Sequence, residues 1–302
     1  MTWAGATRSR ARSPRPAARW TIGIGVRRRL ALVLFVANGM VMPRAWGQQN
    51  GAGTAAAPPG LMASSDSTDP HTAEPERPTV ATPASTVAPG WVEIEFGGQR
   101  SEAGGVTSAS TPAVLKIGLA QRAQLSLFGN WFDMTGRGAH DAGLGDAAIG
   151  VKWRLVDHAP VLGDFAVLPT ITVPASAHGI GSGTTGLGIL LISSHQIGPL
   201  AIDVNAAYTH RSGGGTRAPR SATLWTVSLG SALVGPLGWV GEVSGLPGAA
   251  GPSGSRPIVA CLVGPTLTVR NWLVFDAGLS PTLAGPQAPY VYAGVTWNIG
   301  RL

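Results

Sequence analysis

The sequence predicts an all-β protein, an antiparallel up-and-down transmembrane β-barrel of about 12 strands. Three observations support this class. Apolar residues recur at every second position from Trp91 onward, the connections alternate between long and short, and tryptophans stand near the strand ends. A barrel strand in a membrane meets lipid with one face and the interior with the other, so a period of two is expected.

The chain begins with a predicted secretory signal, residues 1–47, cleaved after Gly47. Three arginines, 27–29, precede an apolar run at 30–41, and "AWG" places small residues at the −3 and −1 positions of the cut. The apolar run is too short to cross a bilayer as a helix. A membrane anchor is the alternative, and we expect translation to start at Val26.

The charge of the chain depends on this leader. The formal net charge is +7, which alone would suggest a nucleic-acid or anionic partner. Residues 1–47 hold nine arginines and no acidic residue, which leaves 13 basic and 15 acidic residues in the rest. We therefore expect no nucleic-acid partner. The single cysteine, Cys261, excludes an internal disulfide and is expected to act as a small apolar residue.

Residues 48–89 form a predicted linker before the barrel, which is assigned to residues 90–302. Alanine, proline, serine and threonine dominate the linker and no apolar periodicity is present, so we predict that it is disordered. The alternative is a plug or a partner-binding tail.

The strands follow from the alternation. The clearest is 200–210, in which Leu200, Ile202 and Val204 share one face, and Asp203 and Asn205 the other. Most segments have the length of about 9–11 residues that a tilted strand needs to cross a bilayer. The twelve segments are 91–100, 112–120, 123–132, 144–156, 164–174, 185–194, 199–210, 222–235, 238–246, 256–269, 272–283 and 290–300.

The connections give the barrel a direction. Long ones, such as "GGQRSEAGGVTSAS" and "RSGGGTRAPRS", alternate with short ones, such as "AQRA" and "GPLG". Outer-membrane barrels have short periplasmic turns and longer outside loops. Twelve strands that start in the periplasm place the long connections outside, and only 156–163 is long for a periplasmic turn. A soluble β-sandwich gives no reason for such alternation.

Seven tryptophans fit two aromatic girdles at the level of the lipid headgroups. The alternative is that they belong to the core of a soluble β protein. We assign Trp91, Trp153, Trp239, Trp272 and Trp297 to the periplasmic end and Trp131 and Trp225 to the outer end.

Three stretches carry a resemblance to a known family. "GLGDAAIGVKWRL", "FAVLPTITVPAS" and "LAIDVNAAYTHR" contain Gly145, Asp146 and Lys152, then Pro169 and Pro174, then the pair Asp203 and Asn205. From about residue 90 to its end the chain resembles outer-membrane proteins associated with the meta-cleavage pathway of phenol degradation. This resemblance implies an outer-membrane barrel with a role in transport of aromatic or other apolar compounds.

The C-terminal strand, "YAGVTWNI" at 292–299, resembles the signal that the barrel assembly machinery reads. It departs from that signal because Gly300, Arg301 and Leu302 follow it and no terminal aromatic residue is present. We expect this machinery and outer-membrane lipid as partners.

The charged positions of the strands are expected inside the barrel, because a lysine or arginine facing the lipid midplane costs about 2–4 kcal/mol. They would form either a salt-bridge network that fills the barrel or a polar constriction that selects solutes. The predicted lumen residues are Glu93, Glu95, Lys116, Asp146, Lys152, Arg154, Asp203, Asn205, Glu242 and Asp276.

We predict no catalytic residue, metal site or cofactor. His140 with Asp133 or Asp141 could seed a barrel hydrolase, but no signature of a nucleophile and base is present. The glycine-rich stretch 179–188 lacks the lysine and the following helix of a phosphate loop.

The predicted function is passive passage of small compounds, aromatic ones among them, through a channel in the cell outer membrane. The sequence does not identify the solute. A non-conducting barrel with a structural or surface-interaction role is the alternative, and a barrel hydrolase is a remote one.

Overall fold

The computed structural model describes residues 69–136, 138–175, 182–212, 220–247 and 256–302. The predicted signal and residues 48–68 of the predicted linker lie outside the described residues. The strands are β1 Trp91–Ala103, β2 Val106–Ala120, β3 Ala123–Gly136, β4 Ala139–Leu144, β5 Ala147–Ala159, β6 Gly163–Val173, β7 Gly186–Ile197, β8 Leu200–Arg211, β9 Ser221–Val234, β10 Leu237–Leu246, β11 Ile258–Arg270, β12 Leu273–Ser280, β13 Thr282–Ala284 and β14 Tyr290–Arg301.

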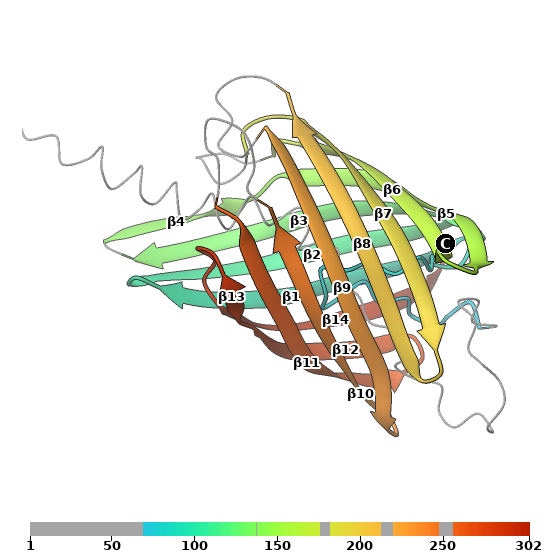
Figure 1. Cartoon of the computed structure of the whole chain (residues 1–302). Coiled ribbons are helices and arrows are strands. Elements are labelled where there is room, and N and C mark those ends of the chain that lie inside the picture. Colours follow the sequence, from blue (N-terminus) through green and yellow to red (C-terminus); the bar gives the residue numbers. More distant parts are fainter. Residues whose placement is uncertain (1–68, 137, 176–181, 213–219, 248–255) are drawn as a thin grey trace, which may run out of the picture.

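These strands close into a twelve-strand antiparallel barrel, as predicted (Figure 1). Neighbours in the chain pair with one another, β1 pairs with β14, and β10 pairs with β11. β4 and β5 both pair with β3, and β12 and β13 both pair with β11, so each of these two pairs forms one interrupted barrel strand. In the described part of the chain, no helix is long and apolar enough to span a membrane.

The alternation of residue types becomes an alternation of burial. On β5, Lys152 and Arg154 are buried while Val151, Trp153 and Leu155 are exposed on the outer surface. Large apolar side chains cover the outer face of most of the other strands in the same way. A belt of this kind suits contact with lipid, where the hydrocarbon replaces water around the apolar side chains.

One end of the barrel carries the short turns, and the C-terminus lies there. The backbone N–H of Leu302 donates to the carbonyl of Gly90 at 2.8 Å, and the N–H of Ala73 donates to the carbonyl of Asn271, in the turn before β12, at 2.8 Å. We call this the short-turn end; it is the end that the sequence places in the periplasm.

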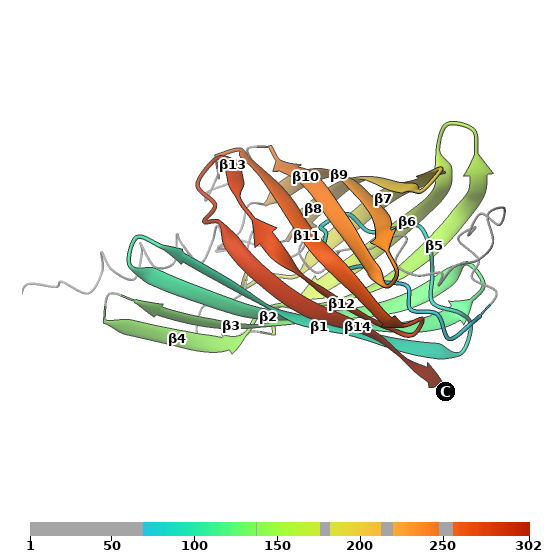
Figure 2. The ribbon, with the colours of Figure 1, turned by 90° about the horizontal axis from the view of Figure 1, so that it is seen from below.

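The opposite end differs from the prediction at two connections, the one after residue 100 and the one after residue 132, where β3 pairs with β4. The expected long loop after residue 100 is a hairpin that Gly104 and Gly105 close, with φ angles of 58° and 75°. Two positive φ angles fit the tight turns that join twisted strands. β1, β2, β3 and β4 therefore continue as ribbons, which extend past the rest of this end (Figure 2). The polar residues that looked like loop keep pairing, because a backbone ladder needs no apolar side chains outside the membrane.

We call residues 69–90 the lumen segment: residues 71–88 lie inside the barrel, and its ends are exposed at Asp69, Pro70 and Pro89 (Figure 1). The sequence predicted a disordered linker here, and in the structure residues 69–89 follow a defined path along the inner wall. The segment includes Glu76, Thr79 and Ala81, all 0% exposed. Its lack of periodicity reflects a chain that joins no strand, and side chains of the barrel wall form hydrogen bonds with its backbone.

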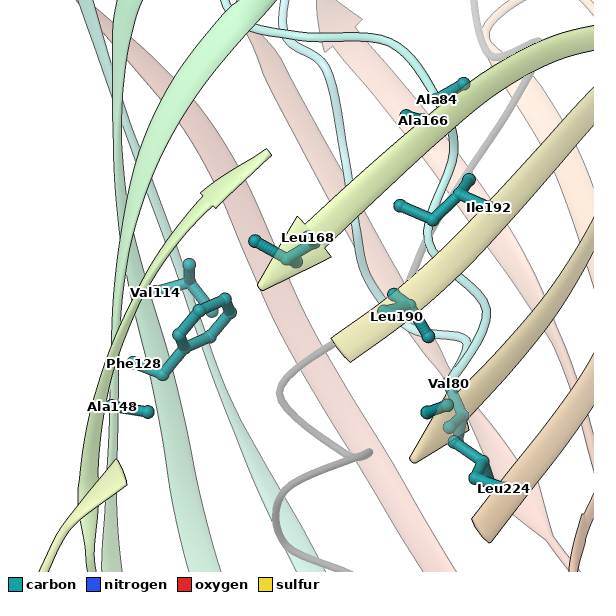
Figure 3. Packing of buried hydrophobic residues seen from close by; sticks show 11 residues of the cluster. Val80, Ala84, Val114, Phe128, Ala148, Ala166, Leu168, Leu190, Ile192 and Leu224 are labelled. Carbon is teal, nitrogen blue, oxygen red and sulfur yellow. The ribbon is translucent and has the colours of Figure 1, made fainter. Parts of the chain in front are cut away.

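The apolar core is partly inside the barrel too. Wall residues from β2 to β9 form a cluster with Val80 and Ala84 of the lumen segment (Figure 3). In this view Val80 lies beside Leu224 and Ala84 beside Ala166. The inner wall is thus apolar along part of its circumference and charged elsewhere.

Candidate functional site: the barrel lumen

The lumen segment forms a loop that starts and finishes at the short-turn end. At its start His71 Nε2 lies 3.0 Å from the carbonyl of Asn298 on β14. Its middle reaches Asp276 on β12 through Arg77. Its return leg reaches β2, where the N–H of Gly90 donates to the carbonyl of Gly118 at 2.8 Å.

A buried cluster of charges holds the first leg. Lys116 Nζ lies 2.5 Å from Oε1 of Glu93 and 2.5 Å from Oε1 of Glu95, and it donates to the carbonyl of Glu74 at 2.5 Å. Glu76 of the segment lies 3.9 Å from the same ammonium. These lysine and glutamate side chains are buried, so the charges compensate one another where water cannot.

Lys152 joins both legs of the segment. Its Nζ lies 2.5 Å from Oε1 of Glu76 and donates to the carbonyls of Pro83, at 3.1 Å, and Ser85, at 2.7 Å. Lys152 is fully buried, and hydrogen bonds from a charged donor are stronger than neutral ones. This lysine therefore fixes the distance between the two legs.

Arg77 of the segment contacts a wall carboxylate. Its Nη2 lies 3.3 Å from Oδ1 of Asp276, and both side chains are buried. A Cβ on Gly97 or Gly294, which pair across β1 and β14, would come within 2.5 Å of the Arg77 guanidinium. These two glycines make room for the arginine side chain against the wall.

Gln124 Nε2 donates to Oε1 of Glu76 at 2.9 Å, and most of the remaining wall contacts go to backbone atoms of the segment. Glu93 and Glu95 accept from the N–H groups of Glu74 and Glu76, each at 2.7 Å. The other contacts are Ala81 N–H to Glu242 at 2.6 Å, Thr82 N–H to Asn205 at 2.5 Å, Ala84 N–H to Ser194 at 2.8 Å, and Val87 N–H to Gln124 at 2.9 Å.

Seven of the ten predicted lumen residues contact the segment directly: Glu93, Glu95, Lys116, Lys152, Asn205, Glu242 and Asp276. Asp203 acts through a neighbour, because it accepts a 2.6 Å hydrogen bond from the Ser194 hydroxyl.

The other two predicted residues have different partners. Asp146 accepts from the hydroxyl of Ser182, at 2.5 Å, and from its N–H, at 2.8 Å, and so anchors the β6–β7 connection. Arg154 Nε lies 3.0 Å from Oδ1 of Asp157, near the short-turn end.

Sequence reasoning missed several contributors to the site. Gln124 on β3 and Ser194 on β7 stand on strands without a predicted charge, but the alternation along those strands could have indicated that they face the lumen. The segment's own Glu76 and Arg77 were hidden in the predicted linker. Their signal was a compact group of charges with Glu74 in a stretch that is otherwise largely small and uncharged.

The tryptophans divide into two groups. Trp131, Trp153, Trp225 and Trp297 are exposed on the outer surface, and Trp239 is half-buried.

Trp91 and Trp272 differ from the girdle assignment, because both rings contact His71 of the lumen segment. Their centroids lie 4.9 Å and 5.7 Å from that of the His71 ring. The period of two explains this position. Trp272 lies an even number of residues before Asp276, so its side chain points to the same side as that of Asp276, which faces the lumen.

Burial raises the pKa of one segment carboxyl. The pKa of Glu74 rises to about 7, because removal from water disfavours its charged form and Glu93 adds repulsion. A hydrogen bond with Ser85 and the nearby Lys116 and Lys152 oppose this rise.

The histidine considered for catalysis lies away from the lumen site. His140 Nε2 is 3.1 Å from Oδ2 of Asp133 on the β3–β4 ribbon, and both side chains are about half exposed. An exposed pair of this kind is solvated, which suits a surface contact.

Comparisons with known proteins agree on the architecture. No protein-family model and no curated protein matches the chain. An outer-membrane channel from Pseudomonas putida F1 superposes with a TM-score of 0.54 at 12% identity, over 70% of this chain and 96% of that one. Two porins also match: NanC has a TM-score of 0.49 at 9% identity, over 68% and 100% of the chains, and KdgM has 0.47 at 10%, over 68% and 99%. The superposition on the Pseudomonas putida F1 channel shows that the chain has the fold of that channel.

Proposed function

We propose that this protein is an outer-membrane channel for passive passage of small compounds, with a lumen that its own N-terminal segment narrows. The observation that carries the proposal is the width of the interior. The lumen holds both legs of a polypeptide loop in addition to the wall side chains. The wall side chains of the smallest barrels fill the interior by themselves, which leaves no room for another chain or a solute.

The inner wall supports the finer proposal that aromatic compounds are among the solutes. Val114, Phe128, Leu168, Leu190 and Ile192 form a buried apolar strip inside the barrel. Val80 and Ala84 of the segment pack against this strip, so a solute reaches it only where the segment moves aside; the strip then favours solutes with an apolar body, because their transfer from water onto it is favourable. Resemblance to proteins associated with phenol degradation points to the same class.

A non-conducting barrel is the second candidate, because the lumen segment is so completely buried. Recording of ion conductance from the purified full chain in planar bilayers separates the two. The channel predicts discrete steps, and a sealed barrel predicts none. Replacement of Glu76 and Arg77 by alanine, which removes the ion pairs of the segment with Lys116, Lys152 and Asp276, should enlarge the steps.

Solute class is tested by flux into liposomes. We expect benzoate to enter faster, relative to a pentose sugar, than it does through a barrel with a polar lumen. An equal ratio would remove the support for aromatic solutes and leave the channel itself untouched. Alanine at Lys152 and at Arg154 should also change the ratio of benzoate entry to pentose entry if solutes pass these two cations.

A further inference from the structure

The barrel wall contacts the lumen segment largely through the segment's backbone. Six N–H groups between Glu74 and Val87 donate to wall side chains. Carbonyl groups in the same stretch accept from Lys116, Lys152 and Asn205. Contacts to N–H and C=O groups are available to any extended chain that follows the same path.

The wall distinguishes this segment from other extended chains through the side chains at a few of its positions. Glu76 contacts Lys116 and Lys152, and the next residue, Arg77, contacts Asp276. Beyond them the path admits only small side chains where Ala81 and Ala84 are 0% exposed. Prolines fit between these positions because they need no partner for an N–H group.

The segment can also be separated from the barrel without breaking the sheet. It pairs with no strand, so none of the ladders that close the barrel includes it. Both of its ends lie at the short-turn end, where Pro89 is exposed. A chain with the same path can therefore enter and leave from that one side.

We propose that the lumen is a peptide-binding site and that residues 69–90 are its resident ligand. The site takes an extended, proline-containing peptide with an adjacent glutamate and arginine, followed by small residues. A free peptide of this chemistry binds when the resident segment is absent or released. This proposal holds whether or not the barrel conducts solutes.

The test is to cut the resident segment from the folded protein. A protease site placed between Pro89 and Gly90 of the full chain leaves the N-terminal fragment attached by non-covalent contacts alone. We expect the fragment to stay with the barrel through size-exclusion chromatography. It should then exchange for a fluorescent synthetic peptide of residues 69–89.

Two variants of the fragment test which of its side chains the barrel wall recognises. Glu76→Ala with Arg77→Ala should release the fragment at least tenfold faster, because the charged contacts are lost. Thr86→Ala is the matched control and should change the rate by less than twofold, because Thr86 meets the wall through one exposed hydrogen bond to the Gln121 carbonyl. Immediate loss of the unchanged fragment from a barrel that still shows heat-modifiable mobility would overturn the proposal.

A second experiment is used if the inserted protease site prevents folding. The uncut chain with Glu76→Ala and Arg77→Ala keeps every wall residue, and we expect the labelled peptide to bind it saturably, one peptide per barrel, in fluorescence anisotropy. No saturable binding, or equal binding of a scrambled peptide, would overturn the proposal. Anisotropy requires no solute flux, so this result and the channel function can fail independently.

Discussion

Arg77 donates a hydrogen bond through Nη2 to Oδ1 of Asp276 at 3.3 Å, and the two side chains are only 6% and 3% exposed. The guanidinium lies against Gly97 and Gly294, which face each other across β1 and β14. A Cβ on Gly294 would have Nε and Nη2 of Arg77 at 2.5 Å as its nearest neighbours. The absence of a side chain on the wall is therefore linked to the docked position of the segment.

Gly294→Ala should displace Arg77 and destabilise the protein by about 1–3 kcal/mol, the usual cost of an added buried methyl group. The loss should become much smaller when Arg77→Ala is present, because the clashing atoms are then gone. The thermal midpoint of heat-modifiable mobility for the two single variants and the double variant measures this coupling.

Gly129→Ala is the matched control for that cycle. It stands on β3, and a Cβ there meets nothing within 4 Å. We expect it to leave the midpoint unchanged. Equal losses from Gly294→Ala with and without Arg77 would show that the cost arises in the sheet and not in the segment.

Lys152→Met should free the segment from the wall. It removes the ammonium that contacts Glu76 and the carbonyls of Pro83 and Ser85, and it leaves a buried carboxylate with less compensation. Breaking a buried ion pair costs about 3–5 kcal/mol. Proteolysis of residues 69–90 by a protease added to detergent-solubilised protein should accelerate at least tenfold. Arg270→Met, at an exposed position of the short-turn end, should leave the rate unchanged, and a stable segment in Lys152→Met would contradict the assigned role.

The docking of the segment should weaken as pH rises through 7. Glu74 has a pKa of about 7 in the docked form and an ordinary value near 4.5 when released, so the docked form holds the proton more tightly. Its contribution to docking is complete below the ordinary pKa and is lost as pH rises through the docked pKa. Proteolysis corrected for the protease's own pH dependence should be faster at pH 8 than at pH 6. Glu74→Gln should flatten this difference, and an unchanged slope would assign it to other groups.

Ile149→Arg tests the lipid-facing surface. Ile149 is exposed near the start of β5, between the outer-surface rings of Trp131 and Trp153, and pairs with Leu127 and Ile171. An arginine at the bilayer midplane costs about 2–4 kcal/mol, and we expect a matching loss in urea-dependent folding into liposomes. Thr135→Arg on the β3–β4 ribbon, beyond the belt, should cost little. Similar costs at the two positions would mean that β5 does not cross the hydrocarbon.

The strands and most of the wall were predictable from local pattern. The segment 200–210 was expected to alternate, and β8 spans Leu200–Arg211 with Asp203 and Asn205 buried. A side chain's parity on a strand decides whether it faces lipid or the lumen, so the charged wall residues were found without a structure. The same rule, applied to Trp91 and Trp272, would have placed their rings inside; their nearness to strand ends led to the girdle assignment.

The sequence by itself determined the barrel strands and their inward charges, because alternation along a strand depends on neighbours within a few residues of the chain. Only the tertiary structure decided what those charges are for. Residues 69–90 have no periodic pattern, and some of their partners lie far away in the sequence: Asp276 is 199 positions from Arg77. A segment whose backbone forms its hydrogen bonds with a wall that is distant in the sequence needs no apolar periodicity of its own. Its sequence therefore resembles that of a disordered chain.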